Sequence, residues 1–439
     1  MKEHGFKPFY FKEGFGLGVA SAATQIEGGE LDHSWNDWYR RGRIRDGSNP
    51  ARANDHYRLW REDAALMRDL GIRHYRLGLE WARIEKREGE FDEEAITHYR
   101  DEMLLLRKYG IRPLLTLHHF TNPRWFEDKG GFLNRENIPS FLNFTERMVT
   151  ELGDLVDEYI TINEPNVYGT HSYMMGLWPP GRRSLGETLR VFANLAAAHI
   201  GAYELIHRLR GPAVKVSFAH HLRVFAPENP KNPKHRFFAR LTAYLFQEAL
   251  TGAMCRGRFS PVVRNSGIPG IAPRGYPRGR YCDFLAINYY TRSTVTGLAD
   301  GVARGVPVND LGWEIYPEGL IQCVENMYRQ CPLPIYITEN GTCDNSDSFR
   351  ARYITEHLGE IAKSSLPFER YYHWCFCDNF EWIEGESARF GIVHVDYETQ
   401  KRTVKESGKL YSEIIRNNGV TEAAYLRYAA AQQYFYGGK

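Results

Sequence analysis

The chain has 439 residues, 43% of them hydrophobic and 25% charged, and its formal net charge is only +2. This length is enough to bury a large core, and α/β barrels often reach such a size as one unit. The near balance of charges favours neither a nucleic-acid partner nor a membrane-surface partner. No apolar run approaches the roughly 18–20 residues that span a bilayer. Residues 1–9 are polar where a secretory signal would be apolar, so we expect a cytoplasmic protein.

The seven cysteines are scattered through the sequence, and no CxxC pair occurs. Cys375 and Cys377 are too close together for the usual zinc spacing. We therefore expect free, buried thiols in a reducing compartment. No phosphate-cradling motif of the P-loop or dinucleotide type is present. The sequence thus indicates neither a metal nor an organic cofactor.

Short β-branched or apolar runs alternate with helical stretches along the chain. The amphipathic patterns at 63–70 and 94–108 are each followed by a glycine, Gly71 or Gly110, where a helix C-cap is expected. Repeated β–α units favour a parallel sheet, and eight of them favour a closed (β/α)8 barrel. The eight expected strands are 15–20, 74–79, 113–117, 159–163, 214–220, 284–288, 335–338 and 371–375.

The intervals between these strands are uneven. The longest interval, residues 221–280, is rich in Pro, Arg and Gly, and we interpret it as an elaborated loop region within one domain that covers 1–439. A C-terminal extension, residues 420–439, follows the last barrel helix. It is either one more outer helix or a docked or frayed terminus.

Two carboxylates come directly after apolar runs that are expected to be barrel strands. Glu164 follows residues 161–163, and Glu339 follows residues 337–338. Active-site groups of such barrels sit at the C-terminal ends of the strands, so both side chains are expected at one mouth. Two carboxylates there suit acetal hydrolysis, in which one protonates the leaving oxygen and the other stabilises or attacks the cationic sugar centre.

The segments 161–165 and 337–341 resemble the acid/base and nucleophile motifs of glycoside hydrolase family 1, the β-glucosidase family. The resemblance extends over about residues 11–417. It implies a (β/α)8 barrel and a retaining double displacement, with Glu164 as general acid/base and Glu339 as nucleophile. It further implies that Arg76 and Tyr290 keep the nucleophile ionised, and that Asn163 reaches the sugar 2-hydroxyl.

Other residues resemble the family's sugar contacts. Gln25 is similar to the residue that holds the 3- and 4-hydroxyls, and His119 to a donor for the 3-hydroxyl. The segment 374–382 resembles the family's last-strand motif. The resemblance implies a substrate-binding set of Gln25, His119, Asn163, Asn288, Trp374, Glu381, Trp382 and Phe390, with Trp178 and Trp313 on the aglycone side.

Glu381 indicates the substrate class. Family members that act on 6-phosphorylated sugars usually have Ser at this position, and a carboxylate would repel a phosphate. We therefore expect a non-phosphorylated β-glycoside as substrate. The chain departs from the family in having Phe120 after His119, where Trp is common, and in its short loops after Gly29 and Gly341. These departures leave the chemistry intact and leave the aglycone preference open.

Three functions remain as alternatives. The first is hydrolysis of terminal β-glucosides, with galactosides or fucosides as side substrates. The second is transglycosylation by the same residues, and the third is a catalytically silent sugar-binding barrel. The presence of both carboxylates argues against the third. The oligomeric state is left open by the sequence.

Overall fold

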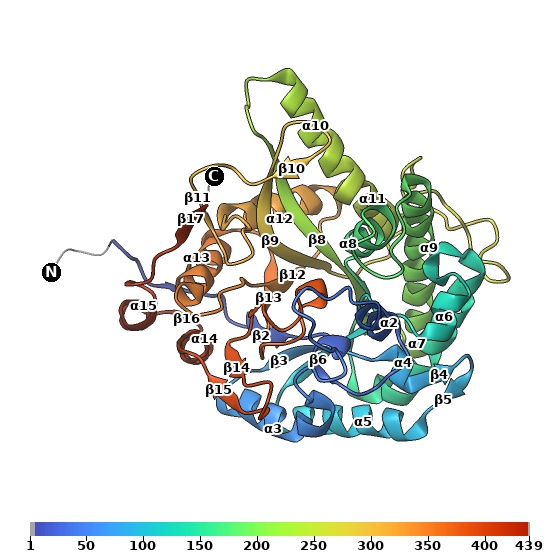
Figure 1. Ribbon diagram of the computed structural model, residues 1–439, viewed down its shortest axis with the longest axis horizontal. Helices are drawn as coiled ribbons and strands as arrows, with labels where there is room; N and C mark the ends of the chain where they lie inside the picture. Colours follow the sequence, from blue (N-terminus) through green and yellow to red (C-terminus); the bar gives the residue numbers. More distant parts are fainter. Residues whose placement is uncertain (1–4, 438–439) are drawn as a thin grey trace.

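A computed structural model describes residues 5–437 of the chain. Eight parallel strands form a closed barrel in the order β2-β3-β6-β7-β8-β9-β12-β13, and β13 pairs with β2 to complete it. Figure 1 shows the helices arranged around these strands. The barrel strands are β2 (Gly16–Ala20), β3 (His74–Gly78), β6 (Arg112–His118), β7 (Glu158–Asn163), β8 (Lys215–Pro227), β9 (Leu285–Val295), β12 (Ile335–Asn340) and β13 (Phe368–Trp374).

The sequence correctly predicted the (β/α)8 barrel and all eight strands. The largest differences are at β8 and β9, which continue to Pro227 and Val295, well past the predicted ends at 220 and 288. These extensions pair with each other in parallel beyond the barrel, with a register shift between Leu222 and Val224. Mixed polar and apolar residues fill the extensions, so no buried-strand pattern marks them in the sequence.

The two helices predicted by amphipathic patterns are also present. Helix α5 (Glu93–Lys108) begins after Asp92, whose carboxylate accepts a hydrogen bond from the Ala95 amide at 3.0 Å. The expected C-terminal glycine, Gly110, has φ +74°, and Gly71 after α3 (His56–Asp69) has φ +80°. Residues other than glycine rarely adopt this backbone conformation, so these glycines end the helices.

The longer helices cover the outside of the barrel, and the shorter elements lie in the loops between strands. The longer helices are α3 (His56–Asp69), α5 (Glu93–Lys108), α7 (Ile138–Leu152), α9 (Leu185–Arg210), α10 (Pro233–Ala243), α11 (Ala249–Arg256), α12 (Glu318–Gln330), α13 (Arg350–Lys363) and α14 (Glu406–Asn417). The shorter helices are α1 (Ala23–Ile26), α2 (Ser34–Arg40), α4 (Trp81–Ile84), α6 (Arg124–Asp128), α8 (Pro165–Gly169) and α15 (Glu422–Tyr428). The minor strands are β1 (Phe9–Tyr10), β4 (Glu85–Arg87), β5 (Glu90–Phe91), β10 (Asp300–Gly301), β11 (Val306–Val308), β14 (Val393–Val395), β15 (Arg402–Val404), β16 (Gly419–Val420) and β17 (Phe435–Gly437).

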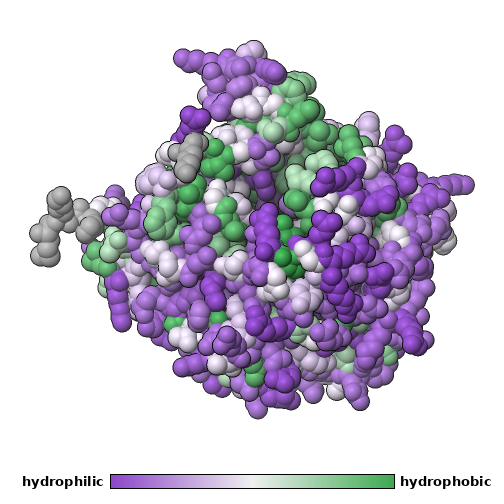
Figure 2. Space-filling model, in the orientation of Figure 1, coloured by the Kyte–Doolittle hydropathy of each residue, from purple (hydrophilic) through white to green (hydrophobic). Residues whose placement is uncertain are grey.

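The interval 221–280 is more regular than an elaborated loop. It contains the end of β8, then α10, a π-helical turn at Tyr244–Glu248 and α11, and only the part after Gly257 is irregular. Figure 1 shows α10 projecting beside the extended β8 and β9 strands. Figure 2 shows hydrophobic side chains gathered over α10, where Phe237 is 61% exposed.

The C-terminal extension is docked on the barrel. It contains α15, and β17 pairs antiparallel with β11. The Phe6 ring stacks on Tyr425 of α15 at 3.9 Å between centroids. Residues 1–4 of the polar start and residues 438–439 of the extension lie outside the described residues.

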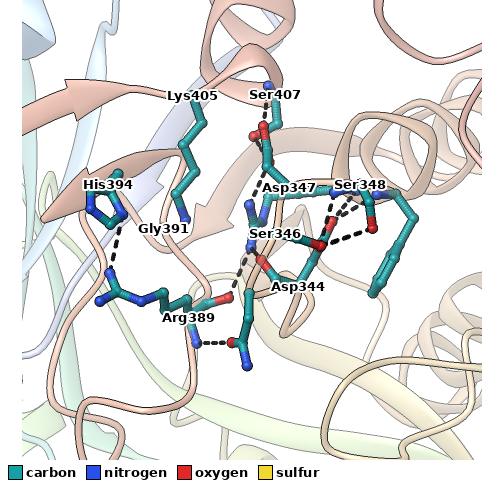
Figure 3. Close-up of polar contacts among 12 residues, drawn as sticks. Asp344, Ser346, Asp347, Ser348, Arg389, Gly391, His394, Lys405 and Ser407 are labelled. Atoms are coloured by element: carbon teal, nitrogen blue, oxygen red, sulfur yellow. Dashed lines mark hydrogen bonds and ion pairs between the residues drawn. The ribbon is translucent and has the colours of Figure 1, made fainter.

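An ion network holds together the two segments that follow β12 and β13 (Figure 3). Asp344 accepts hydrogen bonds from the amides of Phe349 and Arg350, both at 2.8 Å, and so caps α13. The buried Arg350 side chain donates to the Arg389 carbonyl at 2.8 Å. On the second segment, Asp378 accepts from Arg389 at 2.9 Å and from Lys405 at 2.8 Å. The network fixes the loop that carries residues 381–390.

All seven cysteines are buried and free of disulfide bonds, as the sequence predicted. Among residues 5–437, no helix is both long and apolar enough to cross a membrane.

Candidate active site

A cavity of about 310 Å³ contains both predicted carboxyl groups. Glu164 follows β7 and Glu339 lies near the end of β12, so both occupy C-terminal strand ends. Figure 2 shows a hollow flanked by hydrophobic side chains on the face it views. Most of the predicted site residues line the cavity: His119, Glu164, Trp178, Tyr290, Trp313, Glu339, Trp374, Glu381, Trp382 and Phe390.

The remaining predicted residues lie directly behind the cavity wall. Gln25, Arg76, Asn163 and Asn288 are completely buried. Each of them donates or accepts a hydrogen bond that reaches a lining residue. The structure therefore brings the whole predicted set together, in two layers.

Glu339 is held by a cation and a hydroxyl. Arg76 donates from Nη1 to Glu339 Oε1 at 2.5 Å, and Tyr290 donates from its hydroxyl to Oε2 at 2.6 Å. Burial and the neighbouring Glu339 raise the pKa of Tyr290 well above its usual value, so its hydroxyl remains a donor. Both carboxylate oxygens of Glu339 are thus matched by donors, which favours the ionised form.

Glu164 is surrounded by different groups. Its Oε1 accepts a hydrogen bond from Asn288 Nδ2 at 2.8 Å and lies 3.1 Å from His221 Nδ1. Neither contact is with a cation, because burial lowers the pKa of His221 well below its usual value and keeps the ring neutral. Glu164 therefore lacks the direct charge pairing that Glu339 has.

The two carboxyls titrate as a pair. Burial raises the pKa of both groups, and the negative charge of Glu164 raises that of Glu339 further. Arg76 opposes these effects on both groups, and it touches only Glu339. The single charge that such a pair carries near neutral pH is therefore placed on Glu339, and the proton on Glu164.

A chain of hydrogen bonds joins the two carboxyls through Asn163. Its Oδ1 accepts from Arg76 Nη2 at 2.6 Å and from Asn288 Nδ2 at 3.1 Å. Its Nδ2 lies 3.0 Å from His119 Nε2. Arg76 and Asn288 each contact one of the carboxyls, so the chain links Glu339 to Glu164 while positioning the amide next to the cavity.

Gln25 supports the far wall. Its Nε2 donates to Glu381 Oε2 and to Asn379 Oδ1, each at 3.1 Å, and to the Phe380 carbonyl at 2.9 Å. Its Oε1 has no partner among the described residues although it is buried. An unsatisfied buried acceptor is costly, and a ligand hydroxyl would satisfy it.

Burial raises the pKa of Glu381 to about 8. Glu381 is therefore largely protonated at neutral pH. A protonated carboxyl both donates and accepts hydrogen bonds, which is the pattern needed for two neighbouring hydroxyls. The repulsion of a phosphate that the sequence argument expected from a charged carboxylate is therefore weakened, and discrimination rests mainly on the hydrogen-bonding pattern.

Aromatic rings form the walls. Trp374 and Trp382 each lie nearly parallel to the His119 ring, with centroids at 5.9 and 5.8 Å. Phe120 packs against Trp382 at 5.3 Å and against Trp178 at 4.7 Å, so it keeps the apolar wall where the family commonly has Trp. Such faces suit the C–H surface of a sugar ring.

The two predicted aglycone-side tryptophans line the cavity and have different aromatic neighbours. Trp178 belongs to an aromatic cluster with Phe120 and His171. Trp313 is half-buried and packs against Phe390 at 6.0 Å. Both line the cavity, and Trp178 is also a buried member of the hydrophobic core.

Three cavity residues have left-handed backbone conformations. The φ angles are +66° at Phe120, +41° at Glu164 and +52° at Trp382. Such conformations cost about 1–3 kcal/mol each for side chains other than glycine and cluster at functional sites. At Glu164 the strain turns the chain from β7 into α8, with Pro165 at the first helical position and the Glu164 amide bonded to the Ala219 carbonyl at 2.8 Å.

Sequence reasoning missed several residues that line the cavity. They are Arg45, Val167, His171, Leu177, His221, Arg223, Leu311, Ile383 and Glu384. His221 and Arg223 follow the predicted end of the fifth barrel strand. Polar residues at a strand end are the same signal that identified Glu164 and Glu339, so the rule applied to this strand would have found them.

The fold and this site define a barrel glycosidase. The sequence model of glycosyl hydrolase family 1 matches residues 8–420. Beta-glucosidase A of Thermotoga maritima is 31% identical over 94% of this chain and 99% of its own length. Beta-glucosidase A of Acetivibrio thermocellus is 31% identical over 93% and 99%.

Solved structures agree. A beta-glycosidase from Pyrococcus horikoshii superposes with a TM-score of 0.87 at 34% identity, over 97% of this chain and all of that one. A beta-glucosidase from Thermotoga maritima in complex with glucoimidazole gives 0.85 at 31% identity, over 94% of this chain and all of that one. The chain belongs to glycosyl hydrolase family 1 and is a glycoside hydrolase.

Proposed function

We propose that the protein is a retaining β-glucosidase that hydrolyses terminal non-reducing β-D-glucosyl residues from oligosaccharides or glycosides. The observation that carries the proposal is the unequal setting of the two carboxyls. Glu339 is paired with a guanidinium and a phenol, and Glu164 only with neutral donors. A retaining glycosidase needs this difference, because one group must be ionised while the other is protonated.

In the first step the Glu339 carboxylate attacks the anomeric carbon. Glu164 gives its proton to the glycosidic oxygen, so the bond from that oxygen to the sugar breaks and the aglycone leaves as an alcohol. Arg76 and Tyr290 hold the nucleophile's two oxygens. The product of this step is a glycosyl ester of Glu339.

In the second step Glu164 acts as a base. It removes a proton from a water molecule, whose oxygen attacks the anomeric carbon and displaces Glu339. Two inversions give net retention. The two carboxyl groups supply the nucleophile, the acid and the base in this scheme, so it requires no cofactor.

The glucosyl unit is placed between the aromatic walls. Trp374 provides the face for the sugar ring, and Asn163 reaches the 2-hydroxyl next to the reacting carbon. Gln25, His119 and Trp382 hold the 3-hydroxyl region, with Asn288 behind Glu164 and Phe390 along the wall. Glu381 binds the 4- and 6-hydroxyls, and contacts that accept either 4-epimer would admit galactosides and fucosides as side substrates.

Trp178 and Trp313 would contact the aglycone at the cavity mouth. Both rings line the cavity, which supports a preference for aglycones with a flat or apolar surface. The continuous hydrophobic core, which includes residues from Phe11 to Ala429, supports a single catalytic domain.

The proposal is tested with 4-nitrophenyl β-D-glucoside. We expect nitrophenolate release by the native chain and almost none by Glu339→Ala. Proton NMR of the first product would show β-glucose, which then mutarotates. The appearance of α-glucose first would mean inversion, and Glu339 would then not be the nucleophile.

Transglycosylation by the same residues is the second candidate. It differs only in the acceptor that attacks the glycosyl ester, and the apolar groups at the mouth, such as Leu177 and Leu311, would favour an alcohol. Adding a short alcohol and measuring the ratio of alkyl glucoside to glucose separates the two. A dominant alkyl glucoside at low alcohol concentration would favour transfer over hydrolysis.

A further inference from the structure

A histidine and an arginine on the extended part of β8 stand behind Glu164. His221 Nδ1 lies 3.1 Å from Glu164 Oε1, and Arg223 Nη2 lies 3.3 Å from His221 Nε2. Arg223 is itself held by the Ser293 hydroxyl at 3.2 Å and by Asp300 at 3.5 Å. His221 and Arg223 are two positions apart on the strand, so their side chains share one face, and both line the cavity.

Arg223 determines the tautomer of His221. A guanidinium only donates hydrogen bonds, so His221 Nε2 must accept the bond from Arg223. A neutral imidazole with a bare Nε2 carries its proton on Nδ1. Burial and the positive charge of Arg223 both lower the pKa of His221, so the ring is neutral. His221 Nδ1 therefore donates to Glu164 Oε1.

Glu164 Oε1 thus accepts two hydrogen bonds, from His221 and from Asn288. An oxygen with two donors directed at it does not carry the proton of a carboxylic acid, because the proton would clash with one of them. The acidic proton is left on Oε2.

We propose that His221, held in its Nδ1–H tautomer by Arg223, is a positioning residue that keeps the acidic proton of Glu164 on Oε2. This rests on the proposed role of Glu164 as general acid/base. A proton fixed on one oxygen is already aligned for transfer, so the carboxyl does not have to rotate before the reaction. After transfer, the same two donors stabilise the carboxylate that acts as base.

Few charged and titratable groups surround His221 and Arg223. Tyr290 of β9 stacks on the His221 ring at 5.8 Å, and Asp300 pairs with Arg223. Burial lowers the pKa of His171 to about 4, so this ring is neutral and does not repel Arg223. The cavity carboxyls with pKa values raised toward neutral pH are Glu164, Glu339 and Glu381. His221 contacts only Glu164 among them, so a shift caused by its replacement is assigned to Glu164.

The test replaces His221 with residues that keep or lose the Nδ1 donor. The amide nitrogen of Asn lies near the position of His Nδ1, whereas that of Gln lies near Nε2. We therefore expect His221→Leu and His221→Gln to lower kcat/KM about tenfold to hundredfold for an alkyl β-glucoside, which is part of the general-acid contribution. His221→Asn should recover most of this loss. All should leave the glycosylation step of a dinitrophenyl β-glucoside almost unchanged.

A pH profile provides a readout that a structural role would not move. A donor to Glu164 Oε1 stabilises the carboxylate, so its loss raises the pKa of Glu164. The alkaline limb of kcat/KM for the alkyl glucoside should move to higher pH in His221→Leu and stay near its native position in His221→Asn. Arg223→Met, which no longer constrains the His221 tautomer, should also move the limb to higher pH.

His220→Asn is the matched control, because His220 is buried on the same strand and its Nε2 contacts the Gln247 carbonyl, not the site. Thermal melting would show that each variant folds. Equal losses of kcat/KM on alkyl and dinitrophenyl glucosides, with the alkaline limb at its native pH, would contradict the positioning role of His221. If Glu164→Ala itself showed no dependence on the leaving group, the proposed acid/base role would fail instead.

Discussion

Arg76 and Glu339 form a buried ion pair across the barrel although they are 263 positions apart in the sequence. The Arg76 side chain is completely buried and that of Glu339 is 4% exposed. The other two nitrogen atoms of Arg76, Nε and Nη2, donate to Thr116 and Asn163, and Nη1 also donates to the Thr338 carbonyl. A guanidinium satisfied in this way cannot move, so it fixes the charge and the direction of the carboxylate.

Replacing Arg76 with Met should remove most activity. The cation favours the ionised form of Glu339, so its loss raises the pKa of that carboxyl. The acidic limb of kcat/KM should move to higher pH, and kcat/KM should fall by about 100-fold or more. Breaking a buried pair also costs about 3–5 kcal/mol of folding free energy, so rates are compared well below the melting temperature. Arg100→Met, at an exposed pair with Asp154, is the control.

Glu164→Ala should separate substrates by their leaving groups. An activated aryl leaving group departs without a proton, so its glycosylation step is expected to survive, while alkyl glucosides lose about 100-fold or more. The glycosyl ester then lacks its base and accumulates, and added azide should release it as β-glucosyl azide. Rapid-quench kinetics measure both effects. Equal losses for all leaving groups in the glycosylation step would contradict the acid role.

Glu381→Ser tests the substrate class. The Glu381 carboxyl offers hydrogen bonds to two hydroxyls, and a hydrogen bond between neutral partners contributes about 0.5–1.5 kcal/mol. We expect kcat/KM for β-glucosides to fall at least about tenfold, with smaller losses in Glu381→Gln, which keeps a donor and an acceptor. Improved turnover of a 6-phosphoglucoside by the Ser variant would agree with this role. A native preference for the phosphorylated sugar would refute it.

Glu80→Gln should change how stability depends on pH. Glu80 is 1% exposed and caps α4, and burial raises its pKa to about 7. The folded carboxyl keeps its proton up to about pH 7, whereas the unfolded one loses it near pH 4.5. Folding is therefore penalised progressively between these values, by on the order of 3 kcal/mol at about 1.4 kcal/mol per pKa unit.

Denaturant unfolding at pH 4, 6 and 8 measures the effect of Glu80→Gln. Gln is neutral at each pH, so the variant should gain stability relative to the native chain as the pH rises. A constant difference across the series would mean that Glu80 titrates normally in the folded protein.

Asp378→Asn should destabilise the loop that carries Glu381. Burial alone would raise the pKa of Asp378, but bonds from His394 and Lys405 hold it well below its usual range. Removing the charge leaves the buried Lys405 unpaired, at a cost of about 3–5 kcal/mol. Urea unfolding measures the change. Asp396→Asn, at an exposed turn of the same region, should leave unfolding unchanged.

Much of the site could be predicted from sequence because its residues lie within two or three positions of strand ends. Glu164 and Glu339 follow apolar runs whose period and length define strands, and a barrel places all such ends at one mouth. The aromatic residues of the segment 374–382 were predicted differently, from its resemblance to the family's last-strand motif.

Other relationships depend on how distant segments meet. No local pattern indicates that Gln25 lies behind the cavity wall and bonds to Glu381. Nor does any indicate that Asp378 anchors the loop that carries residues 381–390. The helical content of residues 221–280 was also missed, because the Pro, Arg and Gly content of the interval outweighed the apolar spacing in α10 and α11.

The sequence by itself determined the barrel, the two carboxyls and the family, because these follow from strand periodicity and from motifs that are contiguous in the chain. Only the tertiary structure decided which donors reach each carboxyl oxygen and, from these, which oxygen of Glu164 holds the proton. Those properties depend on the field and the donors at each atom, and these come from Arg76, Tyr290, His221 and Asn288. These residues lie on three different strands, and the register of the closed barrel and of the β8–β9 extension sets their separation in space.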